Sequence, residues 1–295
     1  MARKQKNGRG VADWLTDRML RAVIGTLLLL PYHWRVPAMG WIMRRVIAPI
    51  AGYNKRTEVH LRKILPELDQ GARNRIIAGV ADNAGRTFIE NYSTRDFLAR
   101  NASADIHGPG LAALEQARKD GRAVILASGH IGNYEAPRAA LVSRGFEIGG
   151  LYRPATNLFF NDHYKGTMEA FGGPIFAQGR KGTGGFVRHL RSGGMLVLLF
   201  DQRMAGGEMI PFMGRPAPTA TSAADLALRY DALLIPFFGI RKENGLDFRI
   251  EIDAPIEHST ATQMMLELTQ ALEARLRENP DQWFWVHRRW GRIKD

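Results

Sequence analysis

The stretch AVILASGHIGNYEAP, residues 123–137, decides the fold of this chain of 295 residues. It begins as a short apolar run typical of a buried strand and continues through a Gly-bracketed His130 and then Glu135. The residues after Glu135 are compatible with a helix. A strand that runs through a polar turn into a helix is the repeating unit of parallel α/β proteins.

The same alternation continues through most of the chain. Residues 55–100 predict helices. From residue 105 onward, strands are expected at 123–128, 146–153, 174–177, 195–200, 233–240 and 247–253. Helices are expected at 135–145, 163–173, 184–194, 223–230 and 260–277. The pattern predicts an α/β fold with a mixed, largely parallel sheet flanked by helices.

Composition excludes several classes of protein. Hydrophobic residues make up 45% of the chain and charged residues 24%, which is ordinary for a globular protein and argues against global disorder. There is no cysteine, so disulfides, thiolate nucleophiles and cysteine-based metal sites are excluded. No metal or cofactor is expected.

Positive charge is concentrated at the start of the chain. Residues 1–63 hold thirteen Lys and Arg against three Asp and Glu, a net +10 out of +12 for the whole chain. Such asymmetry points to an anionic surface, either a membrane or a nucleic acid. The apolar run Leu27–Leu30 and the tryptophans Trp34 and Trp41 favour the membrane. No nucleic-acid partner is therefore expected.

The apolar part of this segment is short for a membrane span. The charge-free stretch Ala22–Trp34 has 13 residues, whereas a spanning helix needs roughly 20. We expect residues 1–50 to form a basic segment that lies at or shallowly in a lipid interface, with residues 1–10 as a polar tail. A single spanning anchor and a buried core helix are the alternatives. Residues 51–295 are expected to form one domain.

Three groups of polar residues follow predicted strands directly. They are Ser128-Gly129-His130, Arg153, and Asp201-Gln202-Arg203. In parallel α/β sheets, functional sites gather at the carboxyl ends of the strands. We therefore expect these groups to share one edge of the sheet.

His130 and Glu135 are the candidate catalytic pair. If the helix starts just after His130, Glu135 lies about one turn into it and can fix the tautomer of the imidazole. The other ring nitrogen can then take a proton from an attacking hydroxyl. The amides of Gly129 and Gly132 are candidate donors to an oxyanion. The alternative is a histidine at the edge of the core, with Glu135 as an ordinary acid of a first helical turn.

Other residues admit two interpretations each. Arg153 and Arg203 suit a phosphate or an oxyanion, although surface ion pairs are the commoner use of arginine. Asp201 could orient a substrate group or cap a loop. The tail WFWVHRRWG, residues 283–291, suits a membrane interface or a cation–π clasp that holds the terminus in place.

Four blocks together resemble a known family. They are the H-x4-E motif from His130 to Glu135, LYRPATN (151–157), MLVLLFDQR (195–203) continuing to PFMGRPAPTATSAADLALRY (211–230), and NPDQWFWVHRRW (279–290). In this order they resemble the bacterial lipid A biosynthesis acyltransferases of the late, lauroyl- or myristoyl-transferring type. That family lies within the lysophospholipid acyltransferase superfamily.

The resemblance implies a glycerolipid acyltransferase-like fold and a reaction. An acyl chain would pass from an acyl carrier protein thioester, or from acyl-CoA, to a hydroxyl of a lipid A precursor. The place would be the cytoplasmic face of the bacterial inner membrane. His130 would be the general base and Glu135 its partner. Residues implied to bind substrate are Arg153, Asn157, Asp201, Gln202 and Arg203.

Rival interpretations differ in the acceptor or in the chemistry. The acceptor could be a lysophospholipid or another glycolipid. A hydrolase would release the fatty acid to water, and a noncatalytic relative would only bind lipid. These alternatives are distinguished by whether product forms, and by whether its formation requires an acceptor lipid.

Overall fold

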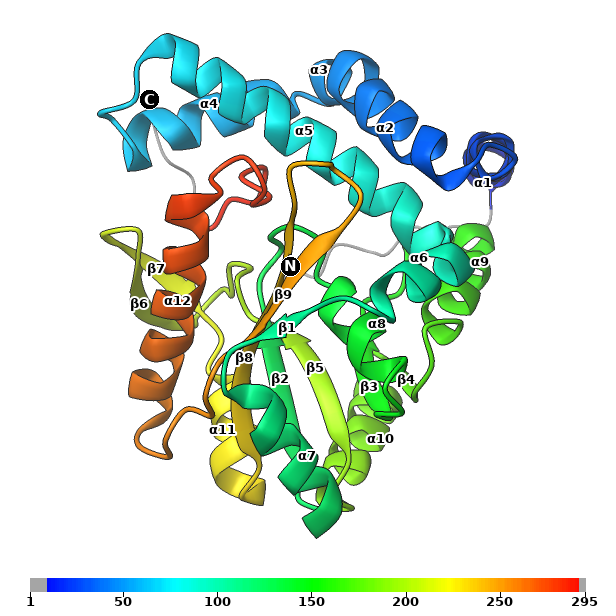
Figure 1. Ribbon diagram of the computed structural model, residues 1–295. Helices are drawn as coiled ribbons and strands as arrows, with labels where there is room; N and C mark the ends of the chain where they lie inside the picture. The colour runs from blue at the N-terminus through cyan, green and yellow to red at the C-terminus, as the bar shows by residue number, and fades with distance from the viewer. Residues whose placement is uncertain (1–9, 292–295) are drawn as a thin grey trace.

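A seven-stranded sheet forms the centre of the computed structural model, which describes residues 10–291 (Figure 1). Its strands are β1 (Ile106–His107), β2 (Val124–Ser128), β3 (Ile148–Tyr152), β4 (Ile175–Ala177), β5 (Met195–Leu199), β8 (Leu233–Arg241) and β9 (Phe248–Ile252). A separate hairpin pairs β6 (Glu208–Phe212) with β7 (Arg215–Thr219).

Helices connect and cover the strands. They are α1 (Val11–Leu28), α2 (Tyr32–Ile42), the π-helical turn η1 (Met43–Ile47), α3 (Ala48–Ile50), α4 (Tyr53–Ile64), α5 (Gln70–Tyr92) and α6 (Thr94–Asn101). The others are α7 (Gly110–Asp120), α8 (Ala136–Val142), α9 (Leu158–Glu169), α10 (Arg180–Arg191), α11 (Ser222–Tyr230) and α12 (Ala261–Glu278).

The strand order is β1-β9-β8-β2-β5-β3-β4. Every neighbouring pair is parallel except β8 and β9. The predicted α/β fold with a mixed, largely parallel sheet is therefore confirmed. In Figure 1, α7 runs down to the bottom of the molecule and β2 then runs upward, so the carboxyl ends of the parallel strands point toward α5.

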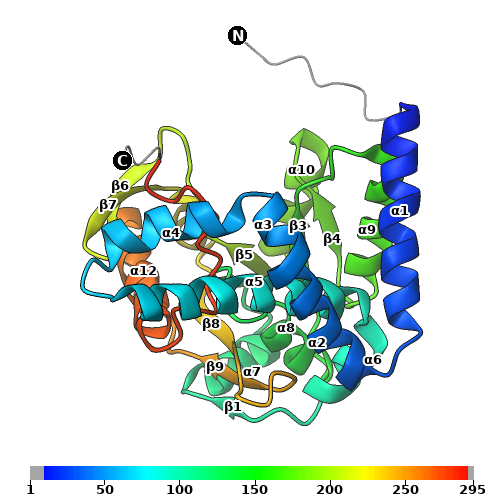
Figure 2. The same cartoon turned by 90° about the horizontal axis from the view of Figure 1, so that it is seen from above.

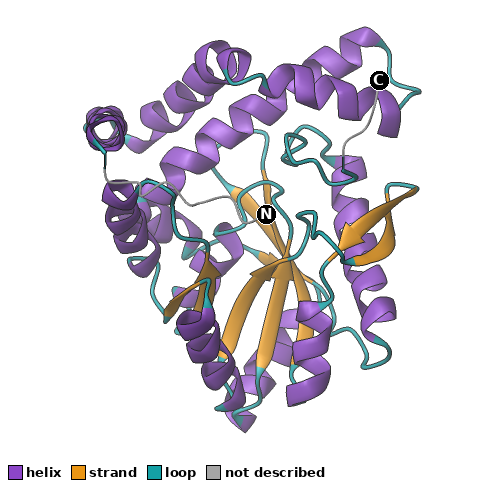
Figure 3. Cartoon of the chain, turned by 180° about the vertical axis from the view of Figure 1, so that it is seen from behind, coloured by secondary structure: helices purple, strands orange, loops and turns teal. Residues whose placement is uncertain are grey.

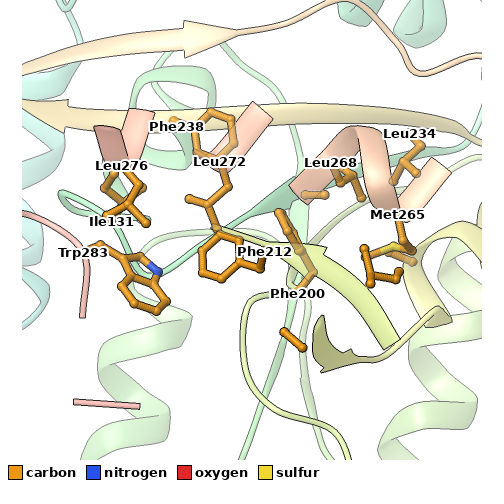
Figure 4. Packing of buried hydrophobic residues seen from close by; sticks show 14 of the residues in the cluster. Ile131, Phe200, Phe212, Leu234, Phe238, Met265, Leu268, Leu272, Leu276 and Trp283 are labelled. Carbon is orange, nitrogen blue, oxygen red and sulfur yellow. The ribbon is translucent and has the colours of Figure 1, made fainter. Parts of the chain in front are cut away.

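Both faces of the sheet are buried, as the apolar strands require. Along β2, Ile125 and Ala127 pack into one core cluster, while Val124 and Leu126 pack into another. This alternation follows from the two-residue period of a strand. The first cluster joins the sheet to α12 and the C-terminal tail, through side chains such as Leu272 (Figure 4). The second joins it to α7 and α8, and Figure 3 shows helices around the sheet from behind.

Some boundaries differ from the sequence prediction, and four elements after residue 105 were missed, namely β1, α7, β6 and β7. Helix α9 begins at Leu158 rather than at residue 163, because the Asn157 side chain accepts hydrogen bonds from the first-turn amides. The two-residue strand β1 was too short to be recognised. Strand β7 contains two prolines, which lie in a two-stranded ribbon that has free edges.

The N-terminal helices lie against the rest of the chain. Helix α2 packs along α5, and α1 packs beside α9, where Figure 2 shows it at one side of the molecule. Within residues 10–291, no helix combines the length and apolarity that crossing a bilayer requires. The expected polar tail falls largely on residues outside the described part, and the division at residue 50 stays a prediction.

A buried ion pair connects α5 to the far end of β8. Glu90 and Arg241 are joined by two hydrogen bonds, Nη1 to Oε1 at 2.5 Å and Nη2 to Oε2 at 2.8 Å. Asn133 donates to Glu90 at 2.9 Å, and Arg241 Nε donates to Asn83 at 2.8 Å. Asn83 in turn donates to the carbonyl of Gly132 at 2.9 Å. The network thus holds the loop after β2 against α5.

Arg241→Met should destabilise the protein by about 3–5 kcal/mol, because it leaves the Glu90 carboxylate buried without its counter-charge. Urea unfolding measures the change. Arg249→Met is the matched control, since Arg249 is 44% exposed in its ion pairs with Glu251 and Glu278. The control should cost less than about 1 kcal/mol. Equal, small losses in both variants would contradict the role given to the buried pair.

Candidate active site

His130 and Asp201 meet because the strands before them are paired in register. Strands β2 and β5 are parallel neighbours, and Ser128 lies opposite Leu199. His130 and Asp201 each come two residues after these partners. The imidazole Nδ1 lies 2.7 Å from Asp201 Oδ1. The sequence prediction placed both residues at this edge of the sheet but did not pair them.

The Asp201 carboxylate is fully used by hydrogen bonds. Its Oδ2 accepts from the backbone amide of His130 at 2.7 Å and from the indole Nε1 of Trp283 at 2.8 Å. Burial alone would raise the pKa of Asp201, but the charge and hydrogen bonds of His130 outweigh it and hold that pKa well below its usual range. An ionised carboxylate can only accept, so Nδ1 of His130 carries its proton and Nε2 is left as the basic nitrogen.

Two further side chains face that basic nitrogen. The amide nitrogen of Gln202 lies 3.3 Å from His130 Nε2 and 3.5 Å from His287 Nε2. The rings of His130 and His287 stand edge to face, with centroids 4.9 Å apart. Burial, together with the charge of His130, lowers the pKa of His287 from 6.5 to about 4. His287 is therefore a neutral neighbour of the base near neutral pH.

The Glu135 carboxylate is paired with Arg138, and within residues 10–291 no hydrogen bond or ion pair joins it to His130. The expected hydrogen bond between Glu135 and His130 is therefore not formed in this structure, and the catalytic role of Glu135 stays a prediction. Helix α8 begins at Ala136, which places Glu135 at its N-cap instead of one turn inside. The Glu135 carboxylate accepts from Arg138 Nη1 at 3.1 Å, and both side chains are buried. The contact matches the alternative interpretation, in which Glu135 is an acid of a helix start.

The loop between His130 and Glu135 also differs from expectation. Gly132 has a φ of +55° and passes so close to Gly239 that a Cβ atom would lie 1.9 Å from the Gly239 carbonyl oxygen. Its amide, expected to face an oxyanion, donates instead to the carbonyl of Gln282 at 3.1 Å. Only glycine fits there.

The remaining predicted residues occupy two kinds of position. Asn157 caps α9 and donates to the carbonyl of Asp13 at 2.6 Å, so both of its polar groups have protein partners. Arg153 and Arg203 are exposed at the carboxyl edge of the sheet, after β3 and β5. Of the predicted site residues, the structure brings His130, Asp201 and Gln202 together.

The C-terminal tail supplies residues that the sequence analysis did not assign to the site. Trp283 and Trp285 are fully buried, and Arg289 lies over the ring of Phe212. This matches the clasp among the two interpretations of the tail. The motif was visible in the sequence, but nothing in it indicated that Trp283 would reach Asp201 or that His287 would face His130.

An apolar cavity of about 270 Å³ opens beside His130. It lies between α5, the loop after β2, α9 and the tail. Its lining residues are Val80, Asn83, Ala84, Thr87, Phe88, Asn91, Tyr92, His130, Gly132, Tyr134, Phe160, Tyr164, Gln282 and Phe284. A basic histidine at the wall of an apolar cavity is suited to a reaction on a group that carries a hydrocarbon chain.

The fold and this site define an α/β protein with a histidine–aspartate pair beside an apolar cavity. Residues 2–292 match the family of bacterial lipid A biosynthesis acyltransferases, so the chain belongs to that family and is an acyltransferase. It is 22% identical to lipid A biosynthesis acyltransferase 2 of Shigella flexneri, over 96% of this chain and 91% of the relative. It is 24% identical to a lipid A biosynthesis acyltransferase of Haemophilus influenzae, over 60% of this chain and 56% of the relative.

Replacing Asp201 should affect turnover far more than replacing Glu135. Asp201→Asn removes the charge that holds the tautomer of His130, and kcat should fall by at least about 100-fold. Glu135→Gln leaves Arg138 buried without a counter-charge, so it should lower stability by about 3 kcal/mol while kcat stays within about tenfold. Single-turnover rates and urea unfolding separate the two effects. The reverse ranking of rates would return the partner role to Glu135.

His287→Gln should make the protein less sensitive to acid. The pKa of His287 is about 4 in the folded chain, against 6.5 for a histidine in solvent, the value expected in the unfolded chain. Between these values the unfolded chain holds a proton that the folded chain lacks, so the free energy of unfolding falls as the pH is lowered through this window. The variant should lack up to about 3 kcal/mol of that loss once the pH falls below about 4. Urea unfolding at several pH values measures it, and parallel curves for the two proteins would refute the expectation.

Proposed function

We propose that this acyltransferase moves a fatty acyl chain from an acyl carrier protein thioester to a hydroxyl of a lipid A precursor. The observation that carries the proposal is the orientation of His130. Its Nδ1 is held by Asp201 at 2.7 Å, and the same ring lines an apolar cavity of about 270 Å³. A base fixed at the wall of a hydrocarbon-sized cavity fits attack of an alcohol on an acyl carbonyl.

The proposed reaction uses one proton shuttle. His130 Nε2 takes the proton of the acceptor hydroxyl as the oxygen attacks the thioester carbonyl and forms a tetrahedral oxyanion. When the intermediate collapses, the carbon–sulfur bond breaks and the leaving thiolate receives the proton back from Nε2. The ionised Asp201 stabilises the imidazolium that exists between these steps.

Two neutral groups near the base are proposed donors to the oxyanion. The Gln202 amide lies 3.3 Å from His130 Nε2 and can turn to a substrate oxygen once the acceptor hydroxyl takes its place. Tyr134 lines the cavity next to His130, and burial raises the pKa of its phenol, which therefore stays protonated and able to donate. Arg153 and Arg203, exposed at the same edge of the sheet, remain candidates for anionic groups of the substrates.

A membrane surface is the proposed place of the reaction. In residues 10–291, eleven of the fifteen exposed large hydrophobic side chains belong to residues 11–50. Ile50 is 83% exposed and Trp34 is 61% exposed. Exposed tryptophans and aliphatic residues beside arginines are typical of helices that lie in a lipid interface. The same basic segment could dock an acidic carrier protein, and we propose the cytoplasmic face of the bacterial inner membrane as its location.

An in vitro transfer assay tests the function. Purified protein in mild detergent receives labelled acyl carrier protein or labelled acyl-CoA, with a lipid A precursor, a lysophospholipid or no acceptor in parallel. Label should pass to the lipid A precursor and be lost by at least about 100-fold in His130→Ala, whose far-ultraviolet circular dichroism should match the wild type.

Other outcomes would replace the proposal. Label found only in the lysophospholipid would keep the mechanism and change the acceptor. Free fatty acid in every tube would indicate a hydrolase. Full activity of His130→Ala would remove the proposed base.

A further inference from the structure

A second cavity lies at the start of the helical layer, away from His130. It has a volume of about 350 Å³ and lies between η1, α3, α4 and α5. Its lining residues are Arg44, Arg45, Pro49, Asn54, Asn74, Ile77 and Ala78. Both arginines come from the π-helical turn η1. Such turns are rare and are frequent at functional sites.

Arg44 and Arg45 have no acidic partner among residues 10–291, and no Asp or Glu lines the cavity. Two other arginines of the N-terminal helices do have acidic partners. Arg21 pairs with Asp17 at 2.8 Å, and Arg35 pairs with Asp96. Two adjacent guanidinium groups that share a hollow repel each other, so an anion bound between them would be stabilised by both.

The side chains around the cavity indicate which kind of anion the two arginines would bind. Trp41, Val46 and Ile50 are exposed on the same helical run, on either side of the two arginines. A small soluble anion makes no favourable contact with these apolar side chains. A lipid that carries a phosphate offers an anion and hydrocarbon together, and guanidinium groups match the oxygens of a phosphate.

This cavity and the cavity beside His130 lie along the same helix, α5, and within residues 10–291 no open passage joins them. Between the two lies a small apolar gap that is too narrow for a water molecule. It shares Asn54 and Ile77 with the first cavity, and Val80, Ala84 and Phe284 with the cavity beside His130. Helix α5 contributes to all three. At about 1.5 Å of rise per residue, Ala78 and Thr87 on this helix are roughly 14 Å apart. A lipid headgroup of more than one sugar unit is of that size.

We propose that Arg44 and Arg45 form a binding site for a phosphate group of a lipid, which during turnover is a phosphate of the acceptor glycolipid. The inference rests on the proposed function for the identity of that acceptor. The same chemistry is also offered by the headgroup of an anionic phospholipid in the bilayer, and the experiment distinguishes these two sources.

Binding measured without turnover tests the site. In a His130→Ala background, the Kd is measured in neutral detergent micelles for the phosphorylated lipid A precursor and for the same lipid after phosphatase treatment. Arg44→Gln/Arg45→Gln should raise the Kd for the phosphorylated lipid by about tenfold or more. It should leave the Kd for the dephosphorylated lipid unchanged.

The matched control is Arg188→Gln/Arg191→Gln. It removes the same two charges from one helix, α10, at exposed positions near the opposite edge of the sheet from His130. The control should bind both lipids like the parent protein. Equal Kd values for the test and control variants would overturn the assignment to the acceptor.

A vesicle experiment separates the two sources of phosphate. Vesicles of phosphatidylcholine alone, or with roughly one part in five of phosphatidylglycerol, are sedimented with each variant. Loss of binding only to the phosphatidylglycerol vesicles, with an unchanged Kd for the acceptor, would keep the phosphate site and assign it to the bilayer. No effect of Arg44→Gln/Arg45→Gln in either experiment would overturn the proposal. If acceptor binding depends on these arginines but the wild-type protein transfers no acyl group in the transfer assay, the proposed function alone would be overturned.

Discussion

The carboxylate of Asp201 is the interaction on which the rest of the site depends. It is buried, and its three hydrogen bonds come from the imidazole of His130, from the amide of His130 and from the indole of Trp283. These donors belong to the loop after β2 and to the C-terminal tail, so one charge after β5 joins three separate parts of the chain. Because a buried carboxylate is stable only when it is fully hydrogen-bonded, the geometry of the base and the position of the tail are set together.

Much of the fold was predictable because its determinants are local. Apolar runs such as residues 195–200 and helical segments such as residues 260–277 show their periodicity directly. The partner of His130 was not predictable from one local motif. Glu135 is near in sequence, but its carboxylate accepts from Arg138. Asp201 is 71 residues further along the chain and becomes a neighbour only through the register of β2 and β5.

The position of the C-terminal tail was also not predictable from a local motif. Its aromatic and cationic composition is obvious in the sequence, yet composition alone left a membrane contact and a clasp equally open. Burial distinguishes the two, since Trp283 and Trp285 are fully buried. The exposed apolar side chains belong instead to the first helices, where Leu29 is 85% exposed. Tertiary packing decides which aromatic residues face solvent, so their exposure could not be predicted from the composition of the segment.

The hydrogen bond from Trp283 to Asp201 also determines when, during synthesis, the site can form. During synthesis the chain emerges from its N-terminal end, and domains fold as their residues become available. The N-terminal helices and the loop with His130 are therefore outside the ribosome before Trp283 and His287 exist. Until those last residues fold back, the carboxylate lacks a donor and the wall of the cavity lacks Phe284. The proposed site can thus be completed only after the segment that carries Trp283 and Phe284 has been synthesised and has folded back.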